Sequence, residues 1–276
     1  MPELPEVEVT RLGLSPALVG QHVLAVVCRT PKLREPLDGL ADGVEGLTLV
    51  DIRRRGKYLI WVFADDSGTV KEYFLSHLGR SGFWRLWDNP APAPGKHDHV
   101  DIVFEKTTAR LTDPRRFGSI RRMQIDPESV QPLSELGAEP FDETLTPEVF
   151  AAAMRKHKQS VKEVLMAGKV VVGCGNIYCS ESLFQAKIDP RRAANRVSAD
   201  RYGVLLGKIR SVLASAIVAG GSTLRDFHGV DGSDGYFALT TAVYGREGEA
   251  CRVCGTTIKR IVQGQRATFY CPRCQK

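Results

Sequence analysis

The chain has 276 residues, of which 43% are hydrophobic, enough for one large folded domain or two ordinary ones and too many for a disordered protein. Lysine and arginine total 38 against 32 aspartate and glutamate, and the net charge of +6 suits a polyanionic partner without proving one. No apolar run approaches the ~20 residues that span a bilayer, and the acidic start lacks the layout of a signal peptide. We therefore expect a soluble, cytoplasmic protein with no membrane partner.

The first six residues read Met-Pro-Glu-Leu-Pro-Glu. A small residue such as Pro2 in second place permits removal of the initiator methionine, which would leave a secondary amine close to the carboxylates of Glu3 and Glu6. An α-amino group titrates near ~8, so a useful fraction is unprotonated at neutral pH and can attack carbon to form an iminium. The alternative is structural, because Pro5 and the acidic residues suit the first turn of a helix. Taken alone, this stretch favours the helix start.

The N-terminal half predicts one helix followed by a series of strands. Apolar spacing indicates a helix from Glu3 to about Val19. Short runs rich in β-branched and aromatic residues then predict strands, at intervals typical of a β-sandwich or barrel. These runs are residues 22–30, 47–54, 58–64, 70–78, 82–87, 100–105, 109–112 and 119–124. The segment 89–95 contains three prolines and is predicted to be a loop.

The second half predicts helices. Residues 126–147 lose the strand character and resemble an interdomain linker, and apolar residues at helical spacing then predict helices over 148–156, 160–167, 177–186 and 199–219. Gly173 and Gly175 lead directly into the third of these helices. Backbone N–H groups at such a helix start can hold a phosphate oxygen, although a plain interhelical turn explains the glycines equally well.

Two Cys-x-x-Cys pairs near the C-terminus form the strongest pattern in the chain. Cys251 and Cys254 are followed, after sixteen residues, by Cys271 and Cys274, a spacing typical of a four-thiolate zinc site. Four protein ligands leave no open coordination position, so we expect one structural zinc. The basic residues between the pairs could contact phosphate or form a solvated face. We expect the remaining cysteines, Cys28, Cys174 and Cys179, to be buried.

Six motifs, in order from end to end, resemble the bacterial formamidopyrimidine-DNA glycosylase family. They are residues 1–8, 55–59, 96–101, 113–118 and 175–178, and the cysteine segment 251–274 with its stretch 265–270. The resemblance implies a multidomain α+β fold that agrees with the predicted elements. The implied parts are an N-terminal β-sandwich with a leading helix (1–128), a linker (129–146), a helix-two-turn-helix DNA-binding domain (147–240) and a C-terminal zinc finger (241–276).

The resemblance also implies a bifunctional DNA glycosylase and abasic-site lyase of base-excision repair. Such an enzyme acts as a monomer on double-stranded DNA that contains abasic sites or oxidised purines, such as 8-oxoguanine and formamidopyrimidines. The matched positions make Pro2 the nucleophile, Glu3 the acid that helps open the sugar ring and Glu6 a supporting carboxylate. Lys57 and Arg266 are assigned to the first and second eliminations. Because guanidinium is effectively always charged, we expect Arg266 to stabilise the leaving phosphate rather than to donate a proton.

The residues that the resemblance assigns to DNA binding are His97, Arg115, Phe117, Lys158, Asn176, Tyr178 and Arg80. Most would contact phosphates, which fix register and carry no sequence information. Phe117 matches a wedge that enters the base stack, and Arg115 matches a residue that faces the orphaned cytosine. Arg80 departs from the family, which usually has methionine there to fill the gap left by the flipped base. Arginine can stack and neutralise phosphate, so the exchange is either tolerated or alters the search for lesions.

Residues 230–241 would correspond to a loop that covers the lesion base. Two alternatives remain open from the sequence. A sister glycosylase with the same Pro-Glu start acts on oxidised pyrimidines, but residues 4–6 and 55–58 favour the purine enzyme. A non-catalytic zinc-bearing DNA-binding protein would explain the charge and the cysteines, but it gives no reason for Pro2 and Glu3 to occur together with Lys57.

Overall fold

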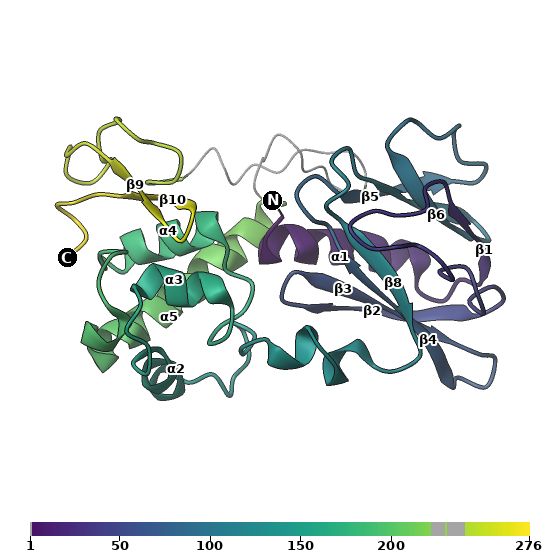
Figure 1. Ribbon diagram of the computed structural model, residues 1–276, viewed down its shortest axis with the longest axis horizontal. Helices are drawn as coiled ribbons and strands as arrows, with labels where there is room; N and C mark the ends of the chain where they lie inside the picture. The colour runs from purple at the N-terminus through teal and green to yellow at the C-terminus, as the bar shows by residue number, and fades with distance from the viewer. Residues whose placement is uncertain (1, 222–229, 231–240) are drawn as a thin grey trace. The chain divides into compact units, whose positions relative to one another are not determined.

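The computed structural model describes residues 2–221, 230 and 241–276 (Figure 1). The chain divides into two compact units. Unit 1 comprises Met1–Ser134 with Ala219–Tyr236, and unit 2 comprises Glu135–Val218 with Phe237–Lys276. Within the described ranges, none of the helices combines the length and the apolar character needed to cross a membrane.

Unit 1 is a β-sandwich that follows a leading helix, α1 (Leu4–Leu18), as the sequence predicts (Figure 1). One sheet has the strand order β2-β3-β4-β8 and the other has the order β1-β6-β7-β5. All neighbouring strands in both sheets pair antiparallel. The strands are β1 (Val23–Cys28), β2 (Thr48–Arg55), β3 (Tyr58–Ala64), β4 (Val70–His77), β5 (Phe83–Asp88), β6 (Asp98–Phe104), β7 (Thr107–Thr112) and β8 (Ser119–Met123).

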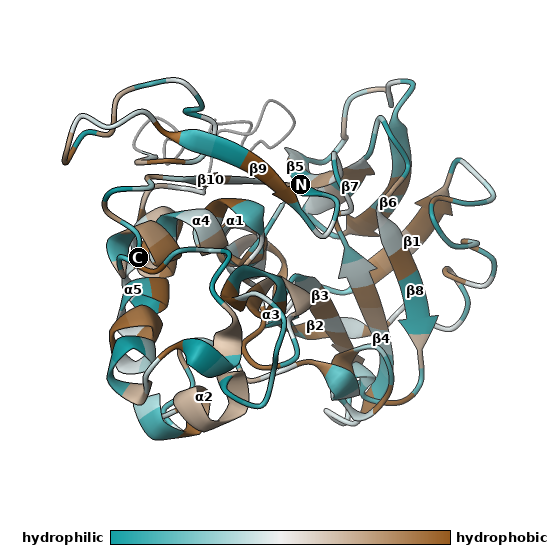
Figure 2. Cartoon of the chain, turned by 60° about the vertical axis from the view of Figure 1, so that its left-hand side comes forward, coloured by the Kyte–Doolittle hydropathy of each residue, from teal (hydrophilic) through white to brown (hydrophobic). Residues whose placement is uncertain are grey.

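The core of unit 1 lies between the two sheets. Trp61 of β3 and Trp84 of β5 come from opposite sheets, and their ring centroids lie 4.8 Å apart. Hydrophobic residues run along β3, where six of seven residues are buried (Figure 2). Leu14 and Leu18 of α1 are buried in the same core, so the helix that carries the N-terminal residues is fixed by apolar packing.

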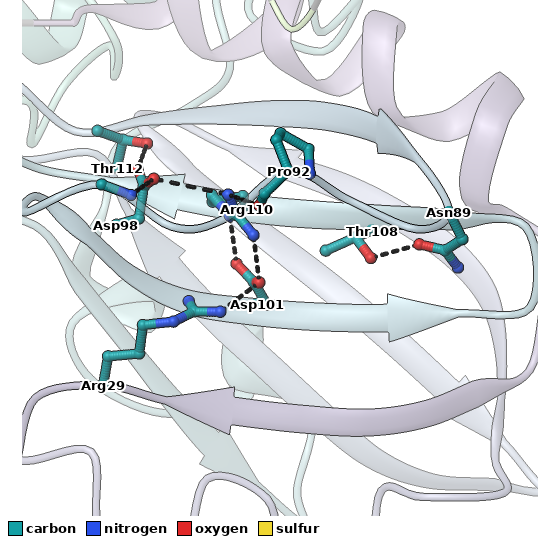
Figure 3. Close-up of polar contacts among 9 residues, drawn as sticks. Arg29, Asn89, Pro92, Asp98, Asp101, Thr108, Arg110 and Thr112 are labelled. Carbon is teal, nitrogen blue, oxygen red and sulfur yellow. Dashed lines mark hydrogen bonds and ion pairs between the residues drawn. The ribbon is translucent and has the colours of Figure 1, made fainter.

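A network of charged side chains ties the proline-rich loop to the sheet of β6 and β7 (Figure 3). Arg110 is buried and donates two hydrogen bonds of 2.8 Å to the carboxylate of Asp101, which also accepts from Arg29. A third bond of 2.9 Å runs from Arg110 to the carbonyl of Pro92. Asp98, the first residue of β6, accepts from Thr112. Because these bonds satisfy the buried charges, they fix the strand start that directly follows His97.

Among its described residues, unit 2 contains four α-helices and a two-stranded hairpin. The elements are α2 (Pro147–Met154), α3 (Val161–Ala167), α4 (Asn176–Gln185), α5 (Ala199–Val218), β9 (Lys259–Gln263) and β10 (Arg266–Tyr270). Ser160 and Glu163 form a capping box at the start of α3, and Gly168 ends that helix in the left-handed conformation. Hydrophilic and hydrophobic residues alternate along α5, and the hydrophobic side of this helix is buried (Figure 2). Phe184 of α4 packs in one hydrophobic cluster with Phe269 of the hairpin.

The predicted helices and strands are confirmed, and their ends differ from the predicted ones by no more than two residues. The predicted linker is not wholly irregular, because short 3₁₀ helices occupy Pro127–Ser129 and Leu133–Glu135. Leu133 is 1% exposed, and its burial anchors the segment. Val130, Leu133 and Leu136 are only three apolar residues in a segment rich in prolines and acids, too short a run for sequence periodicity to reveal this anchor.

Candidate active site and DNA-binding surfaces

The carboxylates near the N-terminus are buried and linked to each other's backbone. Glu3 is the N-cap of α1, and its N–H donates to Glu6 Oε2 at 2.7 Å, while the Glu3 side chain accepts from the backbone of Glu6. Glu3 is 3% exposed and Glu6 is fully buried. Pro2, directly before this capping box, is also buried. The two interpretations of the N-terminal stretch are therefore compatible, because the same carboxylates begin a helix and flank Pro2.

The turn that carries Lys57 is joined to α1 by Arg54. Gly56 and Lys57 form a two-residue connection between β2 and β3, and Gly56 has a φ of +59° that favours glycine. Arg54 donates to Glu8 Oε2 at 2.8 Å and to the carbonyl of Gly56 at 3.1 Å. Burial alone would raise the pKa of Glu8, but hydrogen bonds and charges from Arg11 and Arg54 outweigh it and lower the pKa. A continuous set of bonds therefore runs from α1 to the residue before Lys57.

His77 lies at the end of β4, close enough to Lys57 for the charge of this lysine to affect the pKa of the imidazole. Burial, together with the smaller effect of the positive charges of Lys57 and Arg34, lowers the pKa of His77 to about 4. The Nδ1 atom of His77 accepts a hydrogen bond of 3.0 Å from the N–H of Gly79. A neutral imidazole can accept at that nitrogen and a charged one cannot, so the contact and the pKa agree.

Four of the predicted DNA contacts lie on neighbouring segments of unit 1. Arg80, Arg115 and Phe117 are exposed, and the guanidinium of Arg80 lies over the Phe117 ring, 5.6 Å from its centroid. His97 is half-buried, and its carbonyl accepts from the N–H of Asp113 at 2.9 Å. An exposed ring with stacked guanidinium and further basic groups beside it can contact both base faces and phosphates.

A buried lysine organises the predicted phosphate site of unit 2. Lys162 is 1% exposed, and its ammonium donates to Asn176 Oδ1, to the carbonyl of Ala267 at 3.0 Å and to Thr268 Oγ1 at 2.7 Å. It thereby joins the first residue of α4 to β10, which begins at the exposed Arg266. Three acceptors match the three donors of an ammonium group, so the buried charge is satisfied.

The other predicted contacts of unit 2 differ in their exposure. Lys158 is exposed in the connection between α2 and α3. The Tyr178 side chain is fully buried, so its ring is not presented at the surface, and a contact with phosphate at this position would involve the backbone near the positive end of α4. The glycines before α4 therefore precede a helix start whose Asn176 side chain is held in place.

The four cysteines of the Cys-x-x-Cys pairs are gathered as a zinc site requires. The ligand atoms of Cys251, Cys254, Cys271 and Cys274 all lie within 4.8 Å of one another. The sulfurs of Cys251 and Cys274 are 3.9 Å apart, and those of Cys254 and Cys271 are 3.5 Å apart. Tetrahedral Zn–S bonds of about 2.3 Å place sulfurs about 3.8 Å apart. The residues fit one structural zinc, which would fix the ends of the β9–β10 hairpin.

The turn of this hairpin presents Arg266. Gly264 and Gln265 both have positive φ values, +51° and +62°, the conformation of a two-residue turn that matches strand twist. Arg266 is the first residue after the turn and pairs with Gln263. The turn and the bonds of Lys162 to β10 therefore hold Arg266 in a defined position on the hairpin.

Sequence reasoning missed three buried charged residues that hold these segments: Asp113, Lys162 and Glu181. Glu181 is 3% exposed and accepts from the N–H groups of Ala242, Val243 and Tyr244 at 2.8, 3.0 and 2.8 Å. One sequence signal could have revealed Lys162: it is a charged residue at a position where helical spacing predicts an apolar one, between Val161 and Val164.

The prediction that Cys28 is buried is wrong, because this cysteine is exposed. Cys174 and Cys179 are buried, as predicted.

The predicted cover loop falls mostly outside the described residues, which include Val230 and Thr241 but not 231–240. Val230 packs against the core of unit 1, and its carbonyl accepts from the N–H of Leu86 at 3.1 Å. The prediction for this loop stays a prediction.

Comparison with known proteins gives matches over most of the chain. Family models match residues 1–120 as the formamidopyrimidine-DNA glycosylase N-terminal domain, residues 136–228 as its H2TH domain and residues 248–276 as the zinc finger found in FPG and IleRS. A formamidopyrimidine-DNA glycosylase from Burkholderia thailandensis is 49% identical over 282 residues, covering 100% of both chains.

Solved structures show the same likeness. The MutM (Fpg) protein of Thermus thermophilus is 35% identical, with a TM-score of 0.87 over 99% of this chain and 98% of that one. An Fpg mutant of Lactococcus lactis, in complex with Fapy-dG-containing DNA, is 34% identical, with a TM-score of 0.89 over 100% of both chains. This chain therefore belongs to the formamidopyrimidine-DNA glycosylase family, whose members are DNA glycosylases and abasic-site lyases.

Proposed function

We propose that this protein removes oxidised purines, such as 8-oxoguanine and formamidopyrimidines, from double-stranded DNA and then cuts the strand at the abasic sugar. The observation that carries the proposal is the buried pair Glu3 and Glu6 directly behind Pro2, in a chain that belongs to a family of such enzymes. The Lactococcus lactis relative holds a formamidopyrimidine lesion in its DNA, which supports a purine substrate here.

The reaction begins at the Pro2 nitrogen once Met1 has been removed. The amine attacks the anomeric carbon of the damaged nucleotide, the base departs, and Glu3 donates the proton that lets the sugar ring open. An iminium between Pro2 and the sugar results. Glu6 holds the N–H of Glu3 at 2.7 Å and so keeps the acid in place beside the amine.

Strand cleavage uses the iminium as an electron sink. Its positive nitrogen acidifies the neighbouring sugar carbon, so a proton is lost there and the phosphate on one side leaves by β-elimination. δ-Elimination then releases the other phosphate. Lys57 assists the first step, and Arg266 stabilises the second leaving phosphate by charge because guanidinium keeps its proton.

A further set of side chains binds the DNA around the lesion. These are the exposed Arg80, Arg115, Lys158 and Phe117, together with His97 and Asn176.

We further propose that the protein works as a monomer in the bacterial cytoplasm, on chromosomal DNA. The net charge of +6 suits that polyanion, and binding that depends on phosphate contacts weakens as salt is raised.

Parallel excision assays test the substrate class. On duplexes that differ only in the lesion, 8-oxoguanine should be released faster than thymine glycol, whereas the reverse order would indicate the sister activity on pyrimidines. Borohydride reduction during the reaction should trap a covalent protein–DNA adduct that is absent from Pro2→Gly. A protein that binds the lesion duplex yet forms no adduct would instead be a non-catalytic DNA-binding protein.

A further inference from the structure

The loop pair, defined as residues 78–82 and 113–118, contains a buried carboxylate that the reaction does not use. Asp113 is fully buried. Its Oδ1 accepts from the hydroxyl of Ser81 at 2.7 Å and from the N–H of Arg115 at 3.3 Å, and its Oδ2 accepts from the N–H of Gly118 at 2.7 Å. The same side chain thus bonds to both loops, and to the second loop on both sides of Phe117.

Two glycines let the loops approach closely enough for these bonds. A Cβ atom at Gly79, where φ is +65°, would lie 2.3 Å from the carbonyl carbon of Phe117 and 2.4 Å from the N of Gly118. A Cβ atom at Gly118 would lie 3.0 Å from Asp113 Oδ2 and 3.1 Å from the carbonyl oxygen of His77. The backbones of the two loops are therefore in direct contact at Phe117, and only glycine fits at Gly79 without displacing backbone.

The second loop also holds a strained residue at its tip. Arg116 has a φ of +54°, a conformation that costs a non-glycine residue about 1–3 kcal/mol. Its N–H donates to the carbonyl of Asp113 at 3.3 Å, so the aspartate bonds through both its backbone and its side chain. Strain of this kind persists only where surrounding bonds hold it, and here those bonds converge on one residue.

What the loop pair presents is a charged and aromatic surface. Arg80 comes from the first loop and Phe117 from the second, and the guanidinium lies 5.6 Å from the centre of a ring that is 48% exposed. Exposed cation–π contacts contribute only about 0.5–1 kcal/mol, too little to order two loops. The two loops must therefore be ordered by the buried hydrogen bond beneath them, between Ser81 and Asp113, which are 2% and 0% exposed.

We propose that Asp113 is a positioning residue that, with Ser81, joins the two loops so that Arg80 and Phe117 act as one preassembled wedge. Through the wedge it sets how efficiently a base is displaced from a duplex. This inference rests on the proposed function, because it assigns Arg80 and Phe117 to the displaced base. Ordering the wedge before DNA arrives removes an entropic cost that would otherwise be met during insertion.

The test compares duplex with single-stranded substrates in Asp113→Asn. The asparagine NH₂ group would replace one carboxylate oxygen and would face the N–H of Gly118 in one orientation or the N–H of Arg115 in the other, so a bond to the second loop is lost either way. We expect kcat/KM for 8-oxoguanine in a duplex to fall at least about tenfold, from loss of a charge-assisted bond. Borohydride trapping on a single-stranded abasic oligonucleotide, where no opposite base must be displaced, should change less than about threefold, because the nucleophile and its acids are untouched.

Glu72→Gln is the matched control. Glu72 is also a buried carboxylate of unit 1, 4% exposed, and it bonds Arg122 at 2.6 Å near the start of β4, away from the loop pair. The control should lower the melting temperature at least as much as Asp113→Asn while leaving the ratio of duplex to single-strand rates at the wild-type value.

Ser81→Ala provides a second, milder variant that keeps the carboxylate and its bond to Gly118. It should lower the duplex rate about threefold with the same selectivity, as expected for loss of one hydroxyl bond. If either soluble variant lowers both rates equally, or if Glu72→Gln shifts the ratio as strongly, the positioning role is wrong. A wild-type protein that excises no lesion and forms no adduct would instead refute the proposed function.

Discussion

The loop pair of unit 1 and the β9–β10 hairpin of unit 2 both expose arginines, but opposite charges hold them. Beneath Arg80 and Arg115 lies an anion, Asp113, whose partners are N–H groups and a hydroxyl. Beside Arg266 lies a cation, Lys162, whose partners are amide and carbonyl oxygens and a hydroxyl. In each region one buried charge with a full set of partners orders a segment that has little core of its own.

The two regions differ in what else supports them. The loop pair connects strands of two four-stranded sheets, so its ends are fixed by the sandwich core. The hairpin has two strands of five residues, and an isolated two-stranded hairpin is marginally stable at best. It depends on the cysteine cluster and on its contact with α4. We therefore expect zinc to be essential for the order of the hairpin, one proposed DNA-binding surface, and unnecessary for the fold of the loop pair, the other.

Removal of zinc should therefore have the largest effect. In Cys254→Ser one of four ligands is lost, and a structural zinc contributes on the order of 10 kcal/mol to the order of a small finger. We expect metal content to fall below one per chain and affinity for lesion duplex to drop by about a hundredfold or more, since phosphate contacts of the finger are lost. Cys28→Ser, which changes an exposed cysteine outside the cluster, should match wild type.

The β-sheet signal in circular dichroism should survive in Cys254→Ser, because the sandwich of unit 1 has its own core. Full unfolding of the variant, or undiminished DNA affinity after zinc loss, would contradict the expectation that zinc orders the hairpin and leaves the sandwich intact.

Substitution of Lys162 by methionine should have the next largest effect. It leaves three acceptors without their donor, one of them on the fully buried Thr268, which costs about 1–3 kcal/mol. Asn176 and β10 would lose their common link, so we expect DNA affinity to fall about tenfold. Lys71→Met removes the same charge from an exposed position and should change affinity far less. Equal losses in both variants would mean that net charge, rather than positioning, accounts for the effect.

Loss of Arg54 should separate base removal from strand cleavage. Arg54→Met breaks the link from Glu8 to the turn of Lys57, and a small misplacement of a catalytic group commonly costs about tenfold or more in rate. Strand cleavage should slow by about that factor, while borohydride-trapped adduct persists or accumulates. Arg53→Met is a matched control, because the neighbouring Arg53 pairs with Asp126 and Glu128 instead. A proportional loss of adduct in Arg54→Met would show that the arginine supports the whole site.

A smaller effect is expected from pH. Because burial lowers the pKa of His77 to about 4 from an ordinary value near 6.5, the unfolded chain binds a proton at higher pH than the folded one. Stability contributed by this residue is present above about pH 6.5 and is lost as the pH falls toward 4. An NMR titration should show the imidazole neutral at pH 5.5. A midpoint near 6.5 would mean that His77 is solvated.

The sequence alone predicts the strands and helices because each has a clear period and clear breaks, as at β3 and α5. It also predicts the zinc ligands, since their spacing is set by local geometry. The roles of Pro2 and Lys57 came from motif resemblance rather than from periodicity. Asp113 and Lys162 could not be recognised as supports, because their partners Ser81 and Thr268 lie 32 and 106 positions away in the sequence.

The exposure of individual side chains was the least predictable feature. Tyr178 follows a glycine-rich turn and is predicted to contact DNA, yet its side chain is fully buried. Arg80 could be identified as unusual for its position, but its stacking on Phe117 depends on a contact between two loops. Tertiary proximity of this kind leaves no trace in hydrophobic periodicity.

The most direct test of the central claim is to locate the covalent bond to DNA. Lesion duplex treated with borohydride during the reaction, digested and examined by mass spectrometry should give an adduct on the nitrogen of Pro2. The intact mass should show that the reactive protein lacks Met1. An adduct on Lys57, or efficient cleavage of lesion DNA by protein that retains Met1, would contradict the account.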